Sequence, residues 1–418
     1  MAMATDRFRF WEGVNPNALR LMVTTMILSI LMMGIAAVTR TLFILRLDLG
    51  TEFFGVYNAF AAFGYTGMAI PAGLLGRRFG LKPTMVFGVA TFIVGYLIGP
   101  LVEYTPHTLW VPWSLASQFI SAAGYSILSV NASPAIMATT RPDNRSKTYS
   151  LLSTTRNLGV FVGLVAGGML PTRIAALMNW SLDTTDPYRV ALLGSGLLAV
   201  SALFVLLRYQ EGDASITAKE SVAREGLFPA LSLGLVLVYI VLSQSAIAVC
   251  HSFCNAYMDT ELRLSADFIG WLSALGQVFA VFIPFAVPRL RNRLDNSSLL
   301  IMSSLVSALL VVPVIVGESW VLAGISRMGV MSMSAIWMPV IQMYQMEMVQ
   351  SEYRPIAFAL VSVALGTNFA LVSLFGGYII EAWGYPALFL IGAVAAVCGS
   401  VFLLAIRARP AMQPRFAN

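Results

Sequence analysis

The stretch Gly159-Val-Phe-Val-Gly163-Leu-Val-Ala-Gly167-Gly168 follows a basic segment at Arg145. A second Gly-Gly pair, at 376–377, follows another basic segment at Arg354. Residues 145 and 354 lie 209 positions apart, and residues 167 and 376 are separated by the same 209 positions. Six long apolar runs occur in each half of the chain. The repeat therefore predicts two related six-helix halves.

The composition places these runs in a membrane. Apolar residues make up 58% of the 418 residues and charged residues only 11%, whereas a soluble domain has about a quarter charged residues. A soluble protein has too little interior for this much apolar surface. Each run reaches the roughly 20 residues that cross the hydrocarbon core of a bilayer. The expected spans are 19–45, 53–75, 83–102, 109–138, 150–177, 188–208, 228–257, 267–288, 298–317, 320–348, 356–380 and 386–406.

The predicted fold class is an all-α membrane protein with twelve transmembrane helices in two pseudo-symmetric six-helix halves. We expect an N-terminal half at 1–208, a cytoplasmic linker at 209–226 and a C-terminal half at 227–418. The polar linker fits either a solvated tether or a short surface helix.

Basic residues predict the orientation. Nineteen Lys and Arg residues flank the spans on the side that holds both termini, against four on the other side. The positive-inside rule then places both termini in the cytoplasm of a multi-pass inner-membrane protein. The net charge of +6 follows from this asymmetry and does not indicate nucleic-acid binding.

The residues between the second and third spans resemble a known signature. Gly73-Leu-Leu-Gly-Arg77-Arg78-Phe-Gly80-Leu-Lys82 is similar to the loop motif of the major facilitator superfamily, and Gly159–Gly168 resembles the family's glycine-rich fifth-helix motif. A degenerate second copy of the loop lies at Arg289–Asp295. The resemblance covers the whole chain and implies the two-half transporter fold, whose helices one, four, seven and ten line a central cavity.

The chain departs from the family pattern in its loop and in its fourth span. Arg77 stands where the family has an acid that latches the halves on the cytoplasmic side. Either this latch is weaker or other pairs rebuild it, such as Arg77 or Arg78 with Glu347 or Glu352; alternatively, these arginines are ordinary positive-inside charges without a latch role. Gln118 stands near the position of an intramembrane Arg in family exporters.

From the resemblance of the loop and of the glycine-rich helix to the family motifs, we assign a gating role to Gly73, Arg77, Arg78, Gly80, Gly159, Gly163 and Gly167.

The gating glycines of the fifth span share one face. Gly159, Gly163 and Gly167 recur every four residues, which lets another backbone approach closely. The resemblance suggests contact with span 267–288, which contains Gly270 and Gly276. A purely structural packing seam fits the same pattern.

Three ionisable residues lie inside spans that the resemblance assigns to the cavity. Arg40, His251 and Arg327 should lie about 8–10 Å below the periplasmic surface. A charge that faces lipid is costly, so we expect each side chain to face water or a partner. No acid within a span is placed to pair with these residues, since Glu347 lies at the cytoplasmic end of span 320–348, and an anionic ligand would complete the cluster. Alternatively, the arginines snorkel to the interface or pair with Asp48 or Asp259.

Span 228–257 has a polar stripe at Gln244, His251 and Asn255, on one helix face. Such a stripe indicates a wet path. Arg156 and Asn157, near the start of span 150–177, fit an interfacial anchor. The predicted substrate-binding residues are Arg40, His251, Arg327, Gln118, Gln244, Asn255, Gln277, Trp337, Tyr57 and Asn58.

These features predict a secondary transporter that moves a small organic, anionic solute by alternating access. Efflux of amphipathic drugs and a non-transport receptor or assembly factor are the alternatives. Coupling through His251 and facilitated diffusion or exchange are both open, and soft Cys and Met residues leave Cu(I) transport as a minor alternative. No catalytic motif, cofactor or resident metal is expected. The partners are a small-molecule substrate and the lipid bilayer, with no nucleic acid, and we expect a monomer.

Overall fold

The computed structural model describes residues 15–140, 145–210, 230–282, 290, 292–348 and 354–407. These residues form helices and turns, and none of them belongs to a β-strand. The elements of the first half are α1 (Pro16–Ser29), η2 (Ile30–Arg40), α2 (Thr41–Arg46), α3 (Gly50–Phe79), α4 (Leu81–Ile98), η3 (Gly99–Tyr104), η4 (His107–Leu109), α5 (Trp110–Thr139), α6 (Arg145–Met178) and α7 (Asp186–Leu207).

Two helical segments of the second half are interrupted. Gln244 separates the first two helices, which remain joined by backbone hydrogen bonds on both sides of it. Gly384 has φ 79° and ψ 171°, which breaks the last segment into two helices. The elements are α8 (Ala230–Ser243), α9 (Ser245–Thr260), α10 (Ala266–Phe282), α12 (Asn296–Val316), α13 (Trp320–Met348) and α14 (Arg354–Arg407).

Nine helices of the described chain are long and apolar enough to cross a membrane. The last of them, Ala359–Arg407, belongs to α14 (Arg354–Arg407), which contains both of the final two expected spans. α5 and the 17 described residues of α10 lie where two further spans were expected. The all-helical architecture is confirmed, and the count of twelve membrane helices stays a prediction.

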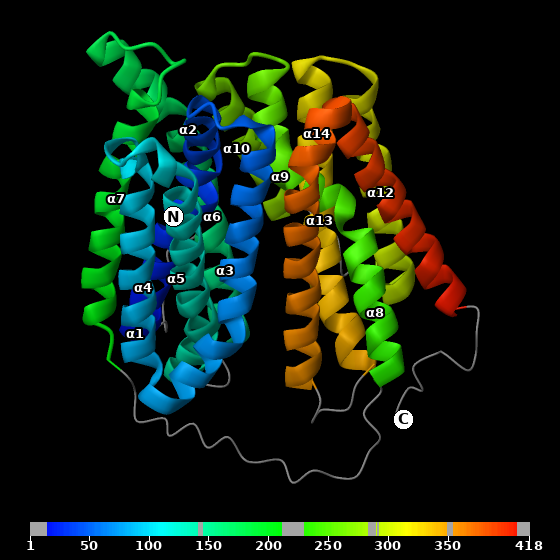
Figure 1. Cartoon of the computed structure of the whole chain (residues 1–418). Coiled ribbons are helices and arrows are strands. Elements are labelled where there is room, and N and C mark those ends of the chain that lie inside the picture. The colour runs from blue at the N-terminus through cyan, green and yellow to red at the C-terminus, as the bar shows by residue number, and fades with distance from the viewer. Residues whose placement is uncertain are drawn as a thin grey trace, which may run out of the picture.

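The helices form two groups that lie side by side (Figure 1). α1 to α7 make up most of one group, and α8, α12, α13 and α14 make up most of the other. We call the end at which α7 stops and α8 begins the linker end, and the end that holds the turns at 47–49 and 261–265 the far end. The predicted boundaries at 208 and 227 stay predictions, because residues 211–229 lie outside the described residues.

The two groups touch along two seams, α3 against α14 and α6 against α10. Glycines allow these close approaches. A Cβ atom on Gly55 would lie 2.5 Å from the Ser373 carbonyl oxygen, and one on Gly168 would lie 2.9 Å from the Gly270 Cα. Outside the seams, large apolar side chains are exposed on several helices, as expected for surfaces in lipid. Examples are Leu74, Phe87, Leu197, Phe204 and Leu309.

Candidate functional site

Arg40 is held inside the first half. Its side chain is buried, and its Nη1 donates a hydrogen bond of 2.6 Å to Gln118 Oε1. The guanidinium carbon lies 4.8 Å from the centre of the Tyr96 ring, and Tyr57 is a further buried neighbour. The structure thus brings together three predicted site residues, Arg40, Gln118 and Tyr57. Arg40 contacts the other two and Tyr96, and their contact with substrate stays a prediction.

Arg327 is likewise buried, in the second half. Its Nη1 donates to the Cys250 carbonyl oxygen at 2.8 Å, and its Nε is buried without a hydrogen-bond partner among the described residues. Its side chain packs beside Gly276, the neighbour of Gln277 in α10. His251 lies within electrostatic range of this guanidinium. The structure therefore brings Arg327, His251 and Gln277 into one region.

His251 reaches an opening inside the bundle. From Ser245 to Asp259, every residue of α9 is buried except His251, which is exposed, and Ser252, which is half-buried. The imidazole ring packs edge-on against Phe369 of α14, with 5.6 Å between ring centres. Because α9 is surrounded by protein, an exposed side chain on it indicates solvent between the helices.

Hydrogen bonds fix the depth of His251 relative to α10 and α6. Ser273 donates to Asn255 Oδ1 at 3.1 Å, which aligns α9 with α10. One helical turn toward the linker end from this contact lie His251 on α9 and Gln277 on α10, both about 6 Å deeper. Gln277 Nε2 lies 3.5 Å from Asn157 Oδ1 of α6. His251, Gln277 and Asn157 therefore share one level between the two halves.

Arg156 lies at the same level, next to Asn157. Its side chain is exposed, and it has no hydrogen bond or ion pair with any other described residue. Its electrostatic neighbours are Tyr125 and Tyr65, on α5 and α3. Leu158 follows two residues later and thus lies on nearly the opposite face of α6. It is one of the large apolar side chains that are exposed on the surface of the protein. Arg156 therefore points into the bundle, which differs from the expected interfacial anchor.

We call Tyr65, Arg156, Asn157, His251 and Gln277 the mid-depth polar set. Its members come from four helices, α3, α6, α9 and α10, and each is exposed or half-buried. The described Asp and Glu residues all lie in loops or within a turn or so of a helix end or break. The set therefore has cationic and hydrogen-bonding groups with no described carboxylate at its depth.

The remaining predicted site residues lie elsewhere. Trp337 is fully buried in the core of the second half, where its Nε1 donates to the Tyr239 hydroxyl at 3.2 Å. Gln244 is buried at the break between α8 and α9, and its Nε2 has no described partner. Asn58 is half-buried on α3. Asn255 donates to the Ala37 carbonyl oxygen at 2.8 Å and thereby links the halves.

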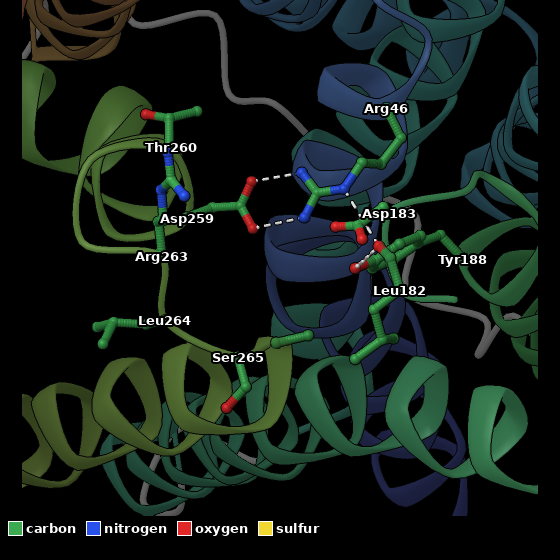
Figure 2. A pocket seen from close by; sticks show the side chains of 10 residues that line it. Arg46, Leu182, Asp183, Tyr188, Asp259, Thr260, Arg263, Leu264 and Ser265 are labelled. Atoms are coloured by element: carbon green, nitrogen blue, oxygen red, sulfur yellow. Dashed lines mark hydrogen bonds and ion pairs between the residues drawn. The ribbon is translucent and has the colours of Figure 1, made fainter. Parts of the chain in front are cut away.

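The far end holds an inter-half ion pair beside a pocket (Figure 2). Arg46 donates from Nη1 and Nη2 to the two carboxylate oxygens of Asp259, at 2.5 and 2.8 Å. Arg46 Nε also donates to the Leu182 carbonyl oxygen at 3.2 Å. The pocket of about 540 Å³ has walls from both halves, including Tyr188 and Arg263. Sequence reasoning considered Asp259 as a partner for Arg40 or Arg327 and missed Arg46.

The gating glycines of α6 pack inside the first half. A Cβ atom on Gly159 would lie 2.8 Å from the Met26 carbonyl oxygen, and a Cβ atom on Gly167 would lie 2.8 Å from the Ile35 carbonyl oxygen. Gly163 packs still more closely on the Ile30 carbonyl oxygen. The expected contact of these three glycines with span 267–288 is therefore wrong. Gly168, one residue beyond, makes that contact because it lies on the adjacent helix face.

The predicted loop motif forms the turn between α3 and α4. Gly80 has φ 92°, a left-handed conformation that favours glycine, and it separates the two helices. Arg77 and Arg78 are exposed, Arg78 lies over the Phe79 ring, and Gly73 is half-buried on α3. Glu347 accepts a hydrogen bond from Asn296 at 2.7 Å, whereas Glu352 lies outside the described residues. The latch role stays a prediction.

Long apolar helices that enclose a polar interior define a multi-pass membrane protein. Residues 21–258 and 231–418 match the model of the Major Facilitator Superfamily, and the chain belongs to this family. The chain is 26% identical over 161 residues to a multidrug resistance protein, MdtH, of Proteus mirabilis. It is 28% identical over 169 residues to a glucose/galactose transporter of Brucella abortus. Each match covers 38% of this chain, and 36% and 40% of these relatives.

Solved structures share the fold over nearly the whole chain. A D-xylose-proton symporter superposes with a TM-score of 0.77 at 16% identity, covering 97% of this chain and all of that one. A nucleoside transporter, NupG, superposes with a TM-score of 0.76 at 12% identity, covering 93% and 99%. At these identities the likeness defines the fold and leaves the substrate open.

Proposed function

We propose that the protein is a secondary transporter that moves a small organic solute with a negatively charged head by alternating access. Membership of the Major Facilitator Superfamily supports transport. The excess of basic residues on the linker side supports an inner-membrane location with both termini in the cytoplasm. In this orientation the far end faces the periplasm. We propose a monomer, because each half supplies part of the mid-depth polar set.

One observation carries the proposal. The halves are joined at the far end, whereas His251 and Arg156 remain exposed to solvent between helices at mid-depth. A protein that is closed on one side of a central polar region has the geometry required for one of two alternating states. In the second state, the contacts at the far end must separate.

Three groups of contacts close the far end. The first is the Arg46–Asp259 ion pair, and the second is the hydrogen bond of 2.9 Å from Thr51 to Glu381. The third is the close backbone packing at Gly55 and Gly168. Each joins one half to the other, so each is a barrier to opening toward the periplasm. We assign the ion pair as the electrostatic component of this gate, beside the Thr51–Glu381 hydrogen bond.

The charges around the centre support an anionic solute. Arg156, Arg327 and the buried Arg40 are cationic, and the described acids lie near helix ends. The predicted contacts of Gln118, Gln244, Asn255, Trp337, Tyr57 and Asn58 with solute remain part of this proposal. Because Arg40 and Arg327 already bind protein oxygens, we expect them to act mainly through their positive charge.

Drug efflux is the second candidate. The similarity to the multidrug resistance protein favours it, as do the aromatic rings of Tyr65 and Phe369 beside the polar set. An aromatic wall suits an amphipathic solute. The two candidates differ in charge selection, because drug efflux of this kind needs no anionic head.

Thermal stabilisation of the purified protein separates the candidates. A ligand that binds the folded state raises the melting temperature, by an amount that depends on its concentration relative to its Kd. Carboxylates, phosphates, sugars and lipophilic cations are compared, and each binder is then tested for uptake into proteoliposomes. Stabilisation and uptake of anions support the proposal. Stabilisation by lipophilic cations alone assigns the protein to drug efflux, and binding without any uptake argues for a receptor.

A further inference from the structure

We infer that Arg156 is the principal ligand for an oxyanion head, a carboxylate or a phosphate, in a site shared by both halves. Asn157 lies beside it on the first half; on the second half, Gln277 contacts Asn157, and His251 lies at about the level of Gln277. The inference rests on the proposed transport function and specifies which charge recognises the solute. It also moves that role from Arg40 and Arg327 to a residue on α6.

The first argument concerns the availability of the guanidinium. Arg156 is exposed and has no hydrogen-bond or ion-pair partner in the described chain. In contrast, Arg40 donates to Gln118 and packs over Tyr96, and Arg327 donates to the Cys250 carbonyl oxygen. A guanidinium has five donors in a planar fork that matches two oxygens of one anion. Of these three arginines, Arg156 is the one whose donors remain available to a solute.

The second argument concerns the position of the charge. Arg156 lies 11 residues into α6, about 16 Å from the start of that helix. The opposite face of α6 carries exposed Leu158 and Val162, which suit lipid. A charge within the bilayer is costly unless it faces water or a partner. The inward direction of Arg156 satisfies this requirement with water when the site is empty and with an anion when it is occupied.

The third argument concerns the opposite wall. The Ser273–Asn255 contact and the Gln277–Asn157 contact place His251 and Gln277 at the depth of Arg156. His251 is exposed there without a hydrogen-bond partner among the described residues. Behind this wall, Arg327 adds a buried positive charge whose Nε has no described partner. An oxyanion between the halves would accept hydrogen bonds from both sides and would compensate this positive charge.

A shared site has a mechanistic consequence. Arg156 and Asn157 belong to the first half, whereas His251 and Gln277 belong to the second. A state in which the halves are close at mid-depth, as the Gln277–Asn157 contact holds them here, brings both sets to one solute. Binding therefore favours an occluded arrangement over either open state, by the difference in affinity between them.

The test compares matched variants with charged and neutral probes. Benzoate and benzamide have nearly the same shape and differ in charge, and inorganic phosphate is the second anionic probe. Thermal shifts and calorimetric Kd values are measured for the full chain and for Arg156→Gln, Arg156→Lys and Arg173→Gln. Arg173 is an exposed arginine on the same helix, outside the polar set, and serves as the matched control.

We expect benzoate or phosphate, but not benzamide, to stabilise the unchanged protein and the Arg173→Gln variant. Arg156→Gln should weaken anion binding by about tenfold or more, because a hydrogen-bonded charge is lost, and Arg156→Lys should retain part of it. A variant that melts at the same temperature as the unchanged protein without ligand rules out misfolding. His251→Gln should weaken binding less, because it removes no fixed charge.

Several results would overturn the inference. Equal anion affinity in Arg156→Gln and the unchanged protein would do so, as would the absence of any anion binding to the unchanged protein. Stabilisation by phosphatidylglycerol alone would assign Arg156 to a lipid headgroup. The proposed function can be contradicted independently of the site. If anions bind through Arg156 but are not taken up into proteoliposomes, the proposal of transport is wrong and the proposal of the anion site is retained. If an anion is taken up equally by the unchanged protein and by Arg156→Gln, the proposal of the anion site is wrong and the proposal of transport is retained.

Discussion

Replacing Asp259 by Asn should open the far end. The substitution keeps the size of the side chain and one acceptor oxygen, but it removes the charge that receives both guanidinium nitrogens of Arg46. Arg46 keeps its hydrogen bond to the Leu182 carbonyl oxygen, so its own half still positions it. The change therefore weakens one inter-half contact and leaves each half intact.

The exposure of the pair sets the expected magnitude. The Arg46 side chain is 20% exposed and the Asp259 side chain 6%, so the pair lies between a surface pair and a buried one. Breaking a surface pair costs about 0–1 kcal/mol, and breaking a buried pair costs about 3–5 kcal/mol. An intermediate loss of about 2 kcal/mol shifts the equilibrium between closed and open far ends by about 30-fold.

Distances between spin labels at the far end report this shift. Thr184 lies in the far-end loop of the first half and Glu261 in that of the second, and both are exposed. Cysteines at these two positions, in a Cys398→Ser background, carry the labels for double electron–electron resonance. We expect Asp259→Asn to transfer population from a short distance to a longer one. The double change Arg46→Asp with Asp259→Arg should restore most of the short-distance population.

The control uses an ion pair within one half. Arg189 donates to Glu103 at 2.8 Å at the same end of the molecule, and both belong to the first half. Arg189→Gln should therefore leave the distance distribution unchanged. If Asp259→Asn gives the same distribution as Arg189→Gln, the ion pair does not hold the far end closed, and the gate must lie in the Thr51–Glu381 hydrogen bond or the glycine seams.

Three further changes test the packing and the loops. Gly163→Ala should lower the melting temperature because its Cβ meets a backbone carbonyl, whereas Gly194→Ala, with no atom within 4 Å, should not. Trp337→Phe should destabilise the second half by about 1–3 kcal/mol in chemical denaturation, since the hydrogen bond to Tyr239 is lost in the core. Partial burial raises the pKa of Asp295, but hydrogen bonds from nearby serines and the Arg407 charge hold it below its usual value. Its stabilising contribution is present above about pH 4 and lost as the pH falls through the depressed pKa, so Asp295→Asn should reduce acid sensitivity in melting curves.

The sequence predicted the fold class because membrane helices and repeats leave strong periodic signals. Apolar length alone located the helices, and the departures are small: α3 and α6 run several residues past the expected spans at the linker end. The interruption at Gln244 was not predicted; beside it, Asn368 of α14 donates hydrogen bonds to the Val241 carbonyl oxygen at 2.5 Å and to the Ser245 hydroxyl at 3.0 Å. Local sequence contains little information about such a contact.

The site was harder to predict because the direction of a side chain depends on helix rotation. The sequence predicts that Arg40 lies within a span, but the direction of its side chain depends on Gln118 and Tyr96, which lie far away in the sequence. The position of Arg156 near one end of a span predicts an interfacial anchor. One available signal was missed: Leu158 and Val162 define the lipid-facing side of α6, and Arg156 is nearly opposite Leu158.

Residues at equivalent positions of the two halves have different roles. Arg46 and Asp259 end the equivalent first spans of the two halves, and they lie 213 residues apart, close to the repeat offset. Equivalent residues that meet between two related halves would repel if they kept the same charge, so opposite charges are required for a contact there. Arg40 and His251 form the next equivalent pair, 211 residues apart. Arg40 is buried within its own half and His251 is exposed between helices, so the two equivalent positions have different surroundings, and only that of His251 is open to a solute.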